Sequence, residues 1–240
     1  MKELKKILSY TRRAIEDYDM IKPGDKIAVG VSAGKDSLSL LFALSRLRRF
    51  YPVKYDLCAI TIDLGFEMTA YTPIADLCKR EGVPFYVVPS TIGRIVFDVR
   101  KETNPCSLCA KMRRGALNGE AKKLGCTKVA LGHHFDDTVE TFMLNLFYEG
   151  RVGCYSPVTY LSNTDLHVIR PFIYVPEKEI RRFAAGVNLP VIENCCPANG
   201  NTERENMKQL LKKLEKENKG LRQRIFGAIK RGGIDGFKPD

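Results

Sequence analysis

Residues 26–47, KIAVGVSAGKDSLSLLFALSRL, decide the fold. The apolar run at 26–32 predicts a short buried strand that ends in a turn containing Gly and Ser. Apolar side chains at helical spacing then predict an amphipathic helix over 36–50. A buried strand that turns directly into a helix is the repeating unit of an α/β sheet.

The same alternation continues outward from this unit. Further strands are predicted at 55–63, 83–89, 128–134 and 168–172, and helices at 3–19, 69–82, 107–125, 136–148 and 176–186. Residues 90–105 fit a strand or a helix, and 149–167 a loop or hairpin. Strands that alternate with helices predict an α/β fold with a doubly wound parallel sheet. The pattern over 203–231 adds a basic helical appendage at the C-terminus.

Composition and charge narrow the class of protein. The 240 residues include 39 Lys and Arg against 28 Asp and Glu, a net charge of +11. This excess favours a polyanionic partner, because clustered cations release counterions from phosphates. There is no run of 18 apolar residues, and the N-terminus lacks the apolar core of a secretory signal. We therefore expect no membrane span and a cytoplasmic protein.

Ser32-Ala33-Gly34-Lys35-Asp36-Ser37, in the turn after the first strand, is the strongest chemical signal. Backbone N–H groups at the start of a helix bind anions because they lack partners and the helix dipole favours negative charge. Gly34 permits close approach of the backbone and Lys35 adds a cation. Asp36 after the lysine distinguishes the motif from a Walker A loop. An ordinary turn capped by Ser and Asp is the alternative, but the position between strand and helix favours phosphate binding.

A second motif, residues 131–141 (LGHHFDDTVET), spans the end of a predicted strand and the start of the next helix. Ligands of open α/β sheets bind at the carboxyl ends of strands. Asp136 or Asp137 could hold Mg²⁺ there, although two aspartates also simply favour a helix N-terminus. Asp63, at the end of the second strand, fits a nucleotide contact by topology, with an exposed loop carboxylate as the alternative.

Two groups stand out among the eight cysteines: Cys106-x-x-Cys109 at a predicted helix start, and the adjacent pair Cys195 and Cys196. In a reducing compartment such spacing indicates metal or redox chemistry rather than disulfides. A redox pair and half of a zinc site are alternatives for the first group. Zinc normally takes four ligands, whereas three thiolates suit a [4Fe–4S] cluster with one open iron.

These motifs together resemble the PP-loop superfamily of N-type ATP pyrophosphatases, whose loop is written S-G-G-x-D-S; Ala33 stands at its middle glycine. The order of this loop, C-x-x-C with M-R-R-G, LGHHxDD, I-R-P-F and a late cysteine before N-x-x-R is similar to the tRNA 2-thiocytidine biosynthesis family. The resemblance covers roughly residues 20–210. It implies an N-terminal helix at 1–22, a PP-loop ATP pyrophosphatase domain at 23–175 and a basic helical region at 176–240.

The resemblance also implies roles for single residues. The cluster ligands would be Cys106, Cys109 and Cys196, because Cys196 stands eight residues before Arg204 as the late family motif requires, with Cys195 as the alternative. The reaction would depend on Lys35, Asp36 and Asp137. The nucleotide-binding residues would be Ser32, Ala33, Gly34, Lys35, Asp36, Ser37, Asp63, Gly132 and His133.

The activity that the resemblance implies is tRNA thiolation. ATP with Mg²⁺ would adenylate the C2 carbonyl oxygen of a pyrimidine in tRNA, cytidine first of all, and sulfur would replace the oxygen with the help of the cluster. The partners would be tRNA and a sulfur donor, either sulfide or sulfur from a cysteine desulfurase, and a homodimer would suit the short chain. The alternatives are a lysidine-type tRNA enzyme, a zinc-stapled RNA-binding protein and a PP-loop thiolase that acts on a small molecule.

Overall fold

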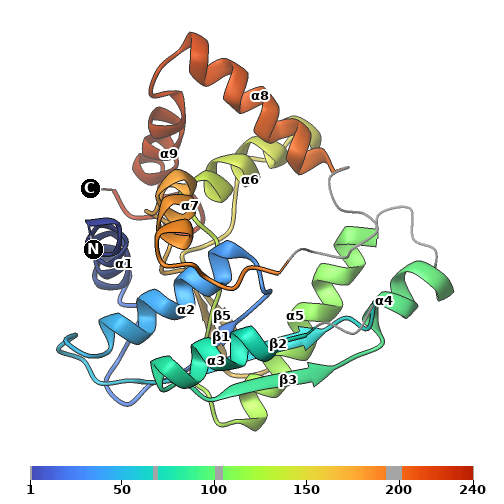
Figure 1. Cartoon of the computed structure of the whole chain (residues 1–240). Helices are drawn as coiled ribbons and strands as arrows, with labels where there is room; N and C mark the ends of the chain where they lie inside the picture. The colour runs from blue at the N-terminus through green and yellow to red at the C-terminus, as the bar shows by residue number, and fades with distance from the viewer. Residues whose placement is uncertain (1, 67–69, 101–104, 193–201, 240) are drawn as a thin grey trace.

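The computed structural model describes residues 2–66, 70–100, 105–192 and 202–239 (Figure 1). Strands and helices alternate along the first two thirds of the chain, as the apolar pattern predicts. The elements in chain order are α1 (Lys2–Asp17), β1 (Lys26–Gly30), α2 (Lys35–Leu47), β2 (Asp56–Asp63), α3 (Thr72–Glu81), β3 (Phe85–Pro89), α4 (Ile92–Arg94), the π-turn η1 (Ile95–Val99), α5 (Pro105–Lys123), β4 (Lys128–Ala130), α6 (Phe135–Tyr148), β5 (Val158–Leu161), β6 (Leu166–Ile169), α7 (Glu177–Gly186), α8 (Glu203–Glu217), α9 (Leu221–Arg231) and the 3-10 turn η2 (Ile234–Gly236).

The six strands form one sheet in the order β3-β2-β1-β4-β6-β5. All neighbouring pairs are parallel except β5 and β6, which pair antiparallel. The parallel α/β sheet is therefore confirmed, and the structure adds one antiparallel strand at an edge. The region predicted as a loop or hairpin supplies β5, and β6 overlaps the strand predicted at 168–172. The two strands pair antiparallel because only a short turn separates them.

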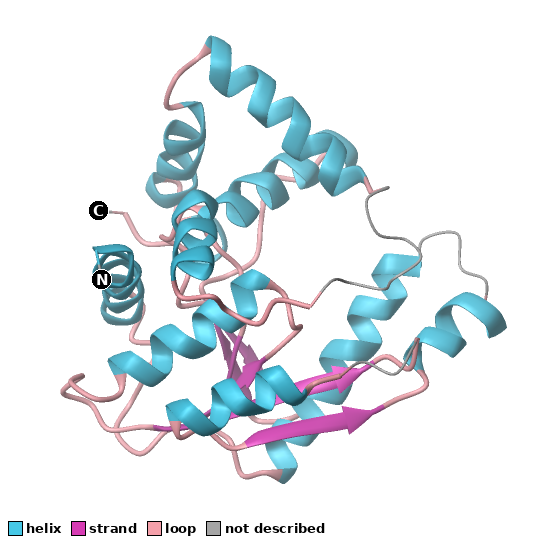
Figure 2. Cartoon of the chain, viewed as in Figure 1, coloured by secondary structure: helices cyan, strands magenta, loops and turns pink. Residues whose placement is uncertain are grey.

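The sheet is covered on both faces, as a doubly wound fold requires (Figure 2). Successive side chains of a strand point to opposite faces. Ile27 and Val29 accordingly join the core beneath α1, α2 and α7, whereas Ala28 joins a second core beneath α5. Because each helix in such a fold follows a strand, the starts of α2, α5 and α6 all lie at the carboxyl edge of the sheet.

Three local expectations are refined by the structure. Residues 92–99 are helical rather than extended. The last strand ends at Ile169 instead of continuing to residue 172. Pro176, expected as the first residue of its helix, is the N-cap with extended backbone at φ −66° and ψ 140°, so α7 begins at Glu177.

The basic C-terminal region forms α8 and α9, which pack onto the rest of the chain. Their apolar side chains Met207, Leu211, Phe226 and Ile229 are buried and belong to the first core, and both helices pack against α6. This packing holds the two helices above the carboxyl edge of the sheet (Figure 1). Among the described helices, none combines the length and the apolar character needed to cross a membrane.

Candidate active site

Residues 32–37, called the phosphate loop below, lead into the first turn of α2, and the side chain of Ser37 holds their conformation. The Ser37 hydroxyl accepts a hydrogen bond from the Ser32 backbone N–H at 3.0 Å and donates one to the Gly34 carbonyl oxygen at 3.1 Å. Ala33 has a φ of 63°, in the left-handed region. This conformation costs an alanine about 1 kcal/mol, which explains why the family pattern has a glycine there.

The start of α2 is open to an anion. Gly34 is its N-cap and provides no side-chain hydrogen bond to the first turn. The backbone N–H groups of that turn point out of the helix without intrahelical partners. A phosphate group placed there would receive these hydrogen bonds and the favourable end of the helix dipole.

Gly132 brings the second motif against the first. A Cβ atom at Gly132 would lie 3.1 Å from both the Asp36 carbonyl carbon and the Ser37 nitrogen. That is tighter than ordinary contacts, so glycine is needed where β4 ends beside the start of α2. The close approach places His133, His134 and the start of α6 next to the phosphate loop.

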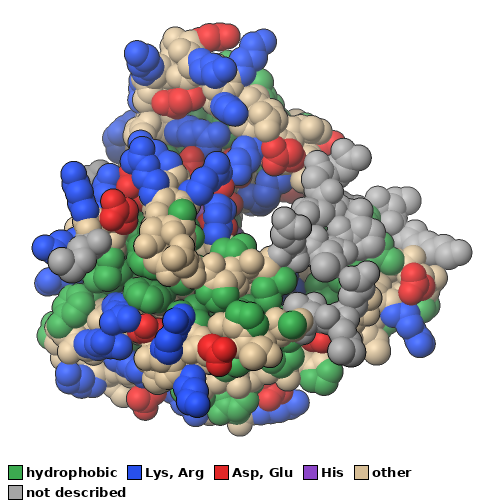
Figure 3. All heavy atoms as spheres, in the orientation of Figure 1, with side chains coloured by type: hydrophobic (Ala, Val, Ile, Leu, Met, Phe, Trp, Pro, Cys, Tyr) green, Lys and Arg blue, Asp and Glu red, His purple; other side chains and the backbone are tan. Residues whose placement is uncertain are grey.

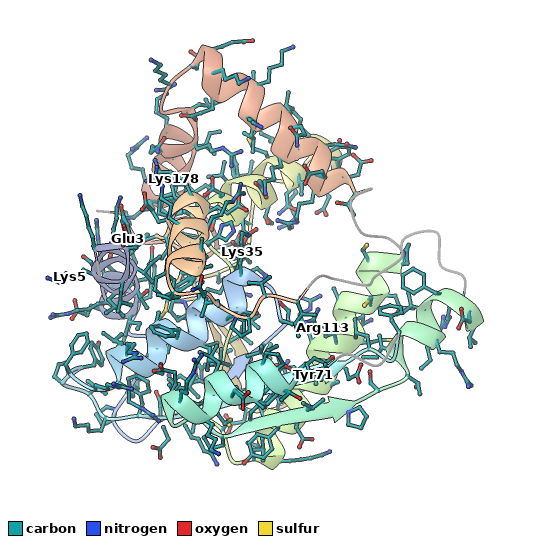
Figure 4. All side chains as sticks on the ribbon, viewed as in Figure 1. Glu3, Lys5, Lys35, Tyr71, Arg113 and Lys178 are labelled. Carbon is teal, nitrogen blue, oxygen red and sulfur yellow. The ribbon has the colours of Figure 1, made fainter. Side chains whose placement is uncertain are left out.

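Lys35 is held by two carboxylates. Its ammonium group lies 2.9 Å from Asp36 and 3.0 Å from Glu177 at the start of α7. Burial acts to lower the pKa of Lys35, but the two carboxylates outweigh burial and raise it, so the side chain is a cation at neutral pH. Figure 4 shows Lys35 at the start of α2, beside α7.

Glu177 accepts several cations at once. Its carboxylate also lies 3.1 Å from Lys208 of α8 and 3.0 Å from Arg181. Burial acts to raise the pKa of Glu177, but Lys35 and Lys208 overcome this effect and hold the pKa well below its usual range. Glu177 is thus a fixed anion that joins the phosphate loop to the C-terminal helices.

The two aspartates that begin α6 have different surroundings. Asp137 accepts the His134 backbone N–H at 3.0 Å, while His134 Nδ1 accepts the Asp137 N–H at 3.3 Å, which forms a capping box. Asp136 accepts the Glu177 backbone N–H at 2.7 Å and an N–H of Arg222 at 2.9 Å. Asp136 therefore fastens α7 and α9, whereas Asp137 faces His134.

A network of charges continues from these aspartates to α8 and α9. Arg222 also lies 3.5 Å from Glu140, one turn further along α6. Arg204 of α8 lies 3.8 Å from Asp137 and 3.9 Å from Glu140. The start of α6 is consequently linked through ion pairs to both C-terminal helices.

Asp36 has one oxygen available for a further partner. Its Oδ2 binds Lys35, but its buried Oδ1 has no hydrogen-bond partner among the described residues. His134 Nε2 lies 3.8 Å from this oxygen. A buried carboxylate oxygen without a partner is suited to a cation such as Mg²⁺, which prefers oxygen ligands.

His133 is held as a neutral side chain. Its ring packs against the ring of Tyr155 with 4.9 Å between centroids. The Arg170 guanidinium lies over the Tyr155 ring, 4.9 Å from its centroid. Burial, helped by Arg170, lowers the pKa of His133 to about 4. A neutral imidazole beside the phosphate loop can act as a hydrogen-bonding group at pH 7.

Asp63 shapes the edge of the sheet next to the loop. It ends β2, and its Oδ1 accepts the Gly65 backbone N–H at 3.0 Å. Its carbonyl oxygen accepts the Ser90 hydroxyl at 2.6 Å. Asp63 thus stands at the carboxyl edge beside β1, where its role as a nucleotide contact stays a prediction.

Cys106 and Cys109 lie in the first turn of α5. Cys106 is exposed, and Cys109 is half-buried against the second core. Residues three apart on a helix share one face, so two thiols face the same side at the carboxyl edge of the sheet. Arg113 follows one turn later, and burial lowers its pKa.

The third expected ligand, Cys196, and its alternative Cys195 lie outside the described residues. The chain on either side of them is anchored at the site. The Ile192 N–H donates to the carbonyl oxygen of Ala33 at 3.1 Å. After the gap, Arg204 donates to the hydroxyl of Thr141 at 3.1 Å.

Comparison with known proteins identifies the arrangement. A family model described as a PP-loop domain matches residues 4–214. The chain belongs to the PP-loop family. Among its relatives is the tRNA-cytidine(32) 2-sulfurtransferase of Geobacter metallireducens, which is 42% identical over 231 residues, 95% of this chain and 90% of the relative. The protein of the same name from Geotalea uraniireducens is 40% identical, over 90% of this chain and 87% of its own.

Solved structures agree with this assignment. The U34-tRNA thiolase NcsA from Methanococcus maripaludis, solved with its [4Fe-4S] cluster, has a TM-score of 0.75 and 25% identity to this PP-loop protein, covering 93% of the chain and 77% of the thiolase. The NH3-dependent NAD synthetase from Campylobacter jejuni shares the fold, with a TM-score of 0.52 and 17% identity over 100% of the chain and 96% of its own. The predicted family is confirmed.

Sequence reasoning about this PP-loop protein missed the residues that close the site from a distance. These residues are Glu177, which contacts Lys35, and Arg204 and Arg222, which contact the start of α6. The sequence pattern indicates only that they lie on helices with exposed charged side chains. Arg204 and Arg222 belong to the run of basic residues over 203–231, and Arg204 also belongs to the late family motif, but neither signal indicates the carboxylates that they contact. The predicted roles of the loop residues, Gly132, His133, Cys106 and Cys109 stay predictions, now with the positions described above.

Proposed function

We propose that this PP-loop protein uses ATP to activate the C2 carbonyl oxygen of a cytidine in tRNA and then replaces that oxygen by sulfur. The observation that carries the proposal is the common position of the phosphate loop and the Cys106–Cys109 pair. Both stand at helix starts, of α2 and α5, at the carboxyl edge of one sheet. The names of the relatives supply the substrate, since they are tRNA-cytidine(32) 2-sulfurtransferases.

The phosphate loop would carry out the activation. The carbonyl oxygen attacks the α-phosphorus of ATP, the bond from that phosphorus to the bridging oxygen breaks, and pyrophosphate leaves. The start of α2 and the Lys35 ammonium offset the negative charge that develops on the phosphates. The pairing of Lys35 with Glu177 keeps that ammonium protonated and in place.

Mg²⁺ fits the carboxylates beside the loop. Asp36 offers its buried Oδ1, and Asp137 lies across His134 from it. Asp136 is less suited, because both of its oxygens already accept hydrogen bonds from Glu177 and Arg222. When bound, the ion would reduce repulsion between the phosphates and the attacking oxygen.

Cys106, Cys109 and Cys196 would hold a [4Fe–4S] cluster. The exposed turn of α5 offers two thiols on one face, and the chain that flanks Cys196 is anchored to Ala33 and Thr141. When bound, such a cluster would supply sulfur to C2 of the activated base, and AMP would leave with the original oxygen. Arg113, labelled beside α5 in Figure 4, adds a positive charge one turn after Cys109.

The partners follow from this chemistry. The sulfur donor is sulfide or sulfur delivered by a cysteine desulfurase, and a homodimer and a cytoplasmic location stay part of the proposal. Because the cysteines must be reduced to bind iron, a reducing compartment suits the site.

Mass spectrometry of nucleosides tests the proposal. tRNA that lacks the modification is incubated without oxygen with reconstituted protein, ATP, Mg²⁺ and sulfide. We expect an oxygen-to-sulfur mass shift on cytidine that requires ATP and is lost in Lys35→Ala. A shift on uridine would move the target, and a lack of any shift together with ATP cleavage on small metabolites would overturn the tRNA substrate.

A further inference from the structure

A groove of about 990 Å³ lies between α7, α8 and α9 and reaches the start of α6. Its lining includes eight lysine and arginine residues and four carboxylates. The groove begins at Asp136 and Glu177, the residues that contact α9 and Lys35. The groove is therefore positive overall, and it adjoins the phosphate loop through Glu177, which contacts Lys35.

Three of the four carboxylates of the groove are engaged with cations or with backbone N–H groups, and the fourth, Glu205, accepts a hydrogen bond from Gln209. Glu177 is paired with Lys35 and Lys208, and Asp136 is paired with Arg222. Glu215 accepts the backbone N–H groups of Gly220 and Arg222 at the start of α9. These bonds fix the three helices, so the positive charge of the remaining lysines is directed to solvent.

Those lysines form a row. Lys208, Lys212 and Lys216 stand four residues apart on α8 and share one helix face, and Lys219 follows in the turn before α9. Four helical residues span about 6 Å, a distance comparable to that between neighbouring phosphates of one nucleic-acid strand. Lys212, Lys216 and Lys219 are exposed, and no ion pair to them is formed within the described ranges.

The opposite wall is also basic. Lys178 is exposed on α7 and labelled in Figure 4, with Arg181 and Arg182 beside it. Figure 3 shows the blue side chains gathered over this part of the molecule, above a hollow that separates the C-terminal helices from the sheet and its covering helices. The inner end of the row, Lys208, shares Glu177 with Lys35 of the phosphate loop.

We propose that this groove binds the RNA backbone next to the target nucleotide, with phosphates along Lys212, Lys216 and Lys219 leading inward to Lys208. The inference rests on the proposed function, which names tRNA as the substrate. Contacts to phosphate need positive charge at regular intervals and no base-reading side chains. The row supplies this, and its inner end delivers the strand to the phosphate loop where the base must react.

The other basic groups of the chain fit this role less well. Arg46 and Arg49 are paired with Glu81 at the far end of α2 from the phosphate loop. Lys230 is buried over the ring of Tyr174. Lys213 adjoins the row in sequence but does not line the groove. The proposal thus separates cations that the sequence alone treats as equivalent.

The test compares two triple variants of the full chain with equal changes in charge. The groove variant carries Lys212→Gln, Lys216→Gln and Lys219→Gln; the control carries Lys2→Gln, Lys54→Gln and Lys79→Gln, all exposed and outside the groove. Affinity for unmodified tRNA is measured by fluorescence anisotropy over a range of salt concentrations. Binding of a fluorescent ATP analogue is measured in the same samples.

We expect the groove variant to bind tRNA more weakly and the slope of log affinity against log salt to fall by roughly two to three, since each lost phosphate contact removes about 0.7–0.9. The control should keep the wild-type slope. In a narrower comparison, Lys212→Gln should lower the slope more than Lys213→Gln.

Equal effects in both triple variants, or none in the groove variant, would overturn the groove while leaving the proposed function intact; an unaffected groove variant would point to an acidic protein as the occupant. A wild-type chain that binds the ATP analogue but no tRNA would instead overturn both the groove and the proposed substrate.

Discussion

The ammonium group of Lys35 in the phosphate loop lies 3.0 Å from the carboxylate of Glu177, which begins α7 much later in the sequence. The same carboxylate is 3.1 Å from Lys208 of α8. One partly buried anion therefore contacts both Lys35 of the phosphate loop and the inner end of the basic groove. Its removal should be felt in the stability of the whole site.

Glu177→Gln should lower the free energy of unfolding at pH 7 by roughly 1.5–3 kcal/mol, the range for hydrogen bonds to charged groups. The pKa of Glu177 is held below its usual range. The stabilisation is therefore complete above the ordinary pKa of about 4.3 and is lost as the pH falls below it. Urea unfolding at pH 7 and pH 3 should show the gap between variant and wild type shrinking in acid. Glu217→Gln, at an exposed position, is the control, and a loss of similar size there would contradict the prediction.

Ala33 should tolerate glycine and reject valine. Its φ of 63° is accessible to glycine at no steric cost but is unfavourable for a β-branched side chain. Ala33→Gly should keep ATP affinity within about twofold, and Ala33→Val should reduce it by at least about tenfold, since 1.4 kcal/mol of strain corresponds to that factor. Titration with a fluorescent ATP analogue measures both. Similar affinities in the two variants would mean that the loop does not need this conformation.

Gly132→Ala should separate the two motifs of the site. The added Cβ would lie 3.1 Å from the backbone of Asp36 and Ser37, so the loop must shift. We expect a loss of about 1–3 kcal/mol in stability, the usual cost of overpacking, together with weaker ATP binding. Gly119→Ala is the matched control, because a Cβ there meets nothing within 4 Å and helix propensity favours alanine. An equal change in the two variants would contradict the close packing described here.

Cys106→Ala should remove iron and thiolation while keeping ATP binding. The exposed thiol lies in the first turn of α5, so its loss should not disturb the core. Iron content after anaerobic reconstitution, the absorption of the cluster and the mass of modified nucleosides provide three readouts. Cys154→Ala, half-buried away from α5, is the control and should keep all three. Full iron content in Cys106→Ala would rule out Cys106 as a ligand.

His133 should make stability depend on pH in mildly acidic solution. Its pKa is lowered to about 4 by burial, against about 6.5 in an unfolded chain. The unfolded state therefore binds a proton that the folded state does not, and stability is full above about pH 6.5 and falls as the pH drops toward 4. His133→Gln should reduce this slope by about 1 kcal/mol per pH unit, as one proton less is bound on unfolding. Unchanged slopes in urea titrations between pH 7 and 4.5 would contradict the burial of a neutral imidazole.

Local sequence predicts the parts of this fold that depend on neighbours in the chain. The strand, turn and helix of residues 26–47 follow from apolar spacing, and so does the open helix start of the phosphate loop. The Cys106–Cys109 pair falls in the first turn of a helix as its spacing indicates. These features need no information about distant residues.

Pairs brought together by packing could not be predicted in this way. Nothing near Arg222 in the sequence indicates Asp136, and nothing near Glu177 indicates Lys35. The antiparallel edge strand β5 has only four residues and no continuous apolar run, so periodicity is a weak guide. These two ion pairs and the pairing of β5 depend on contacts between residues that are distant in the sequence.

The hydrogen bond from Ile192 to Ala33 and that from Arg204 to Thr141 have a thermodynamic consequence. They attach both sides of the segment that contains Cys195 and Cys196 to the two motifs that frame the ATP site. Any ligand that favours one arrangement of those motifs also favours one separation of the anchors. Under the proposed function, nucleotide and metal would be linked ligands, and linkage is reciprocal: the factor by which one changes the dissociation constant of the other must be the same in both directions.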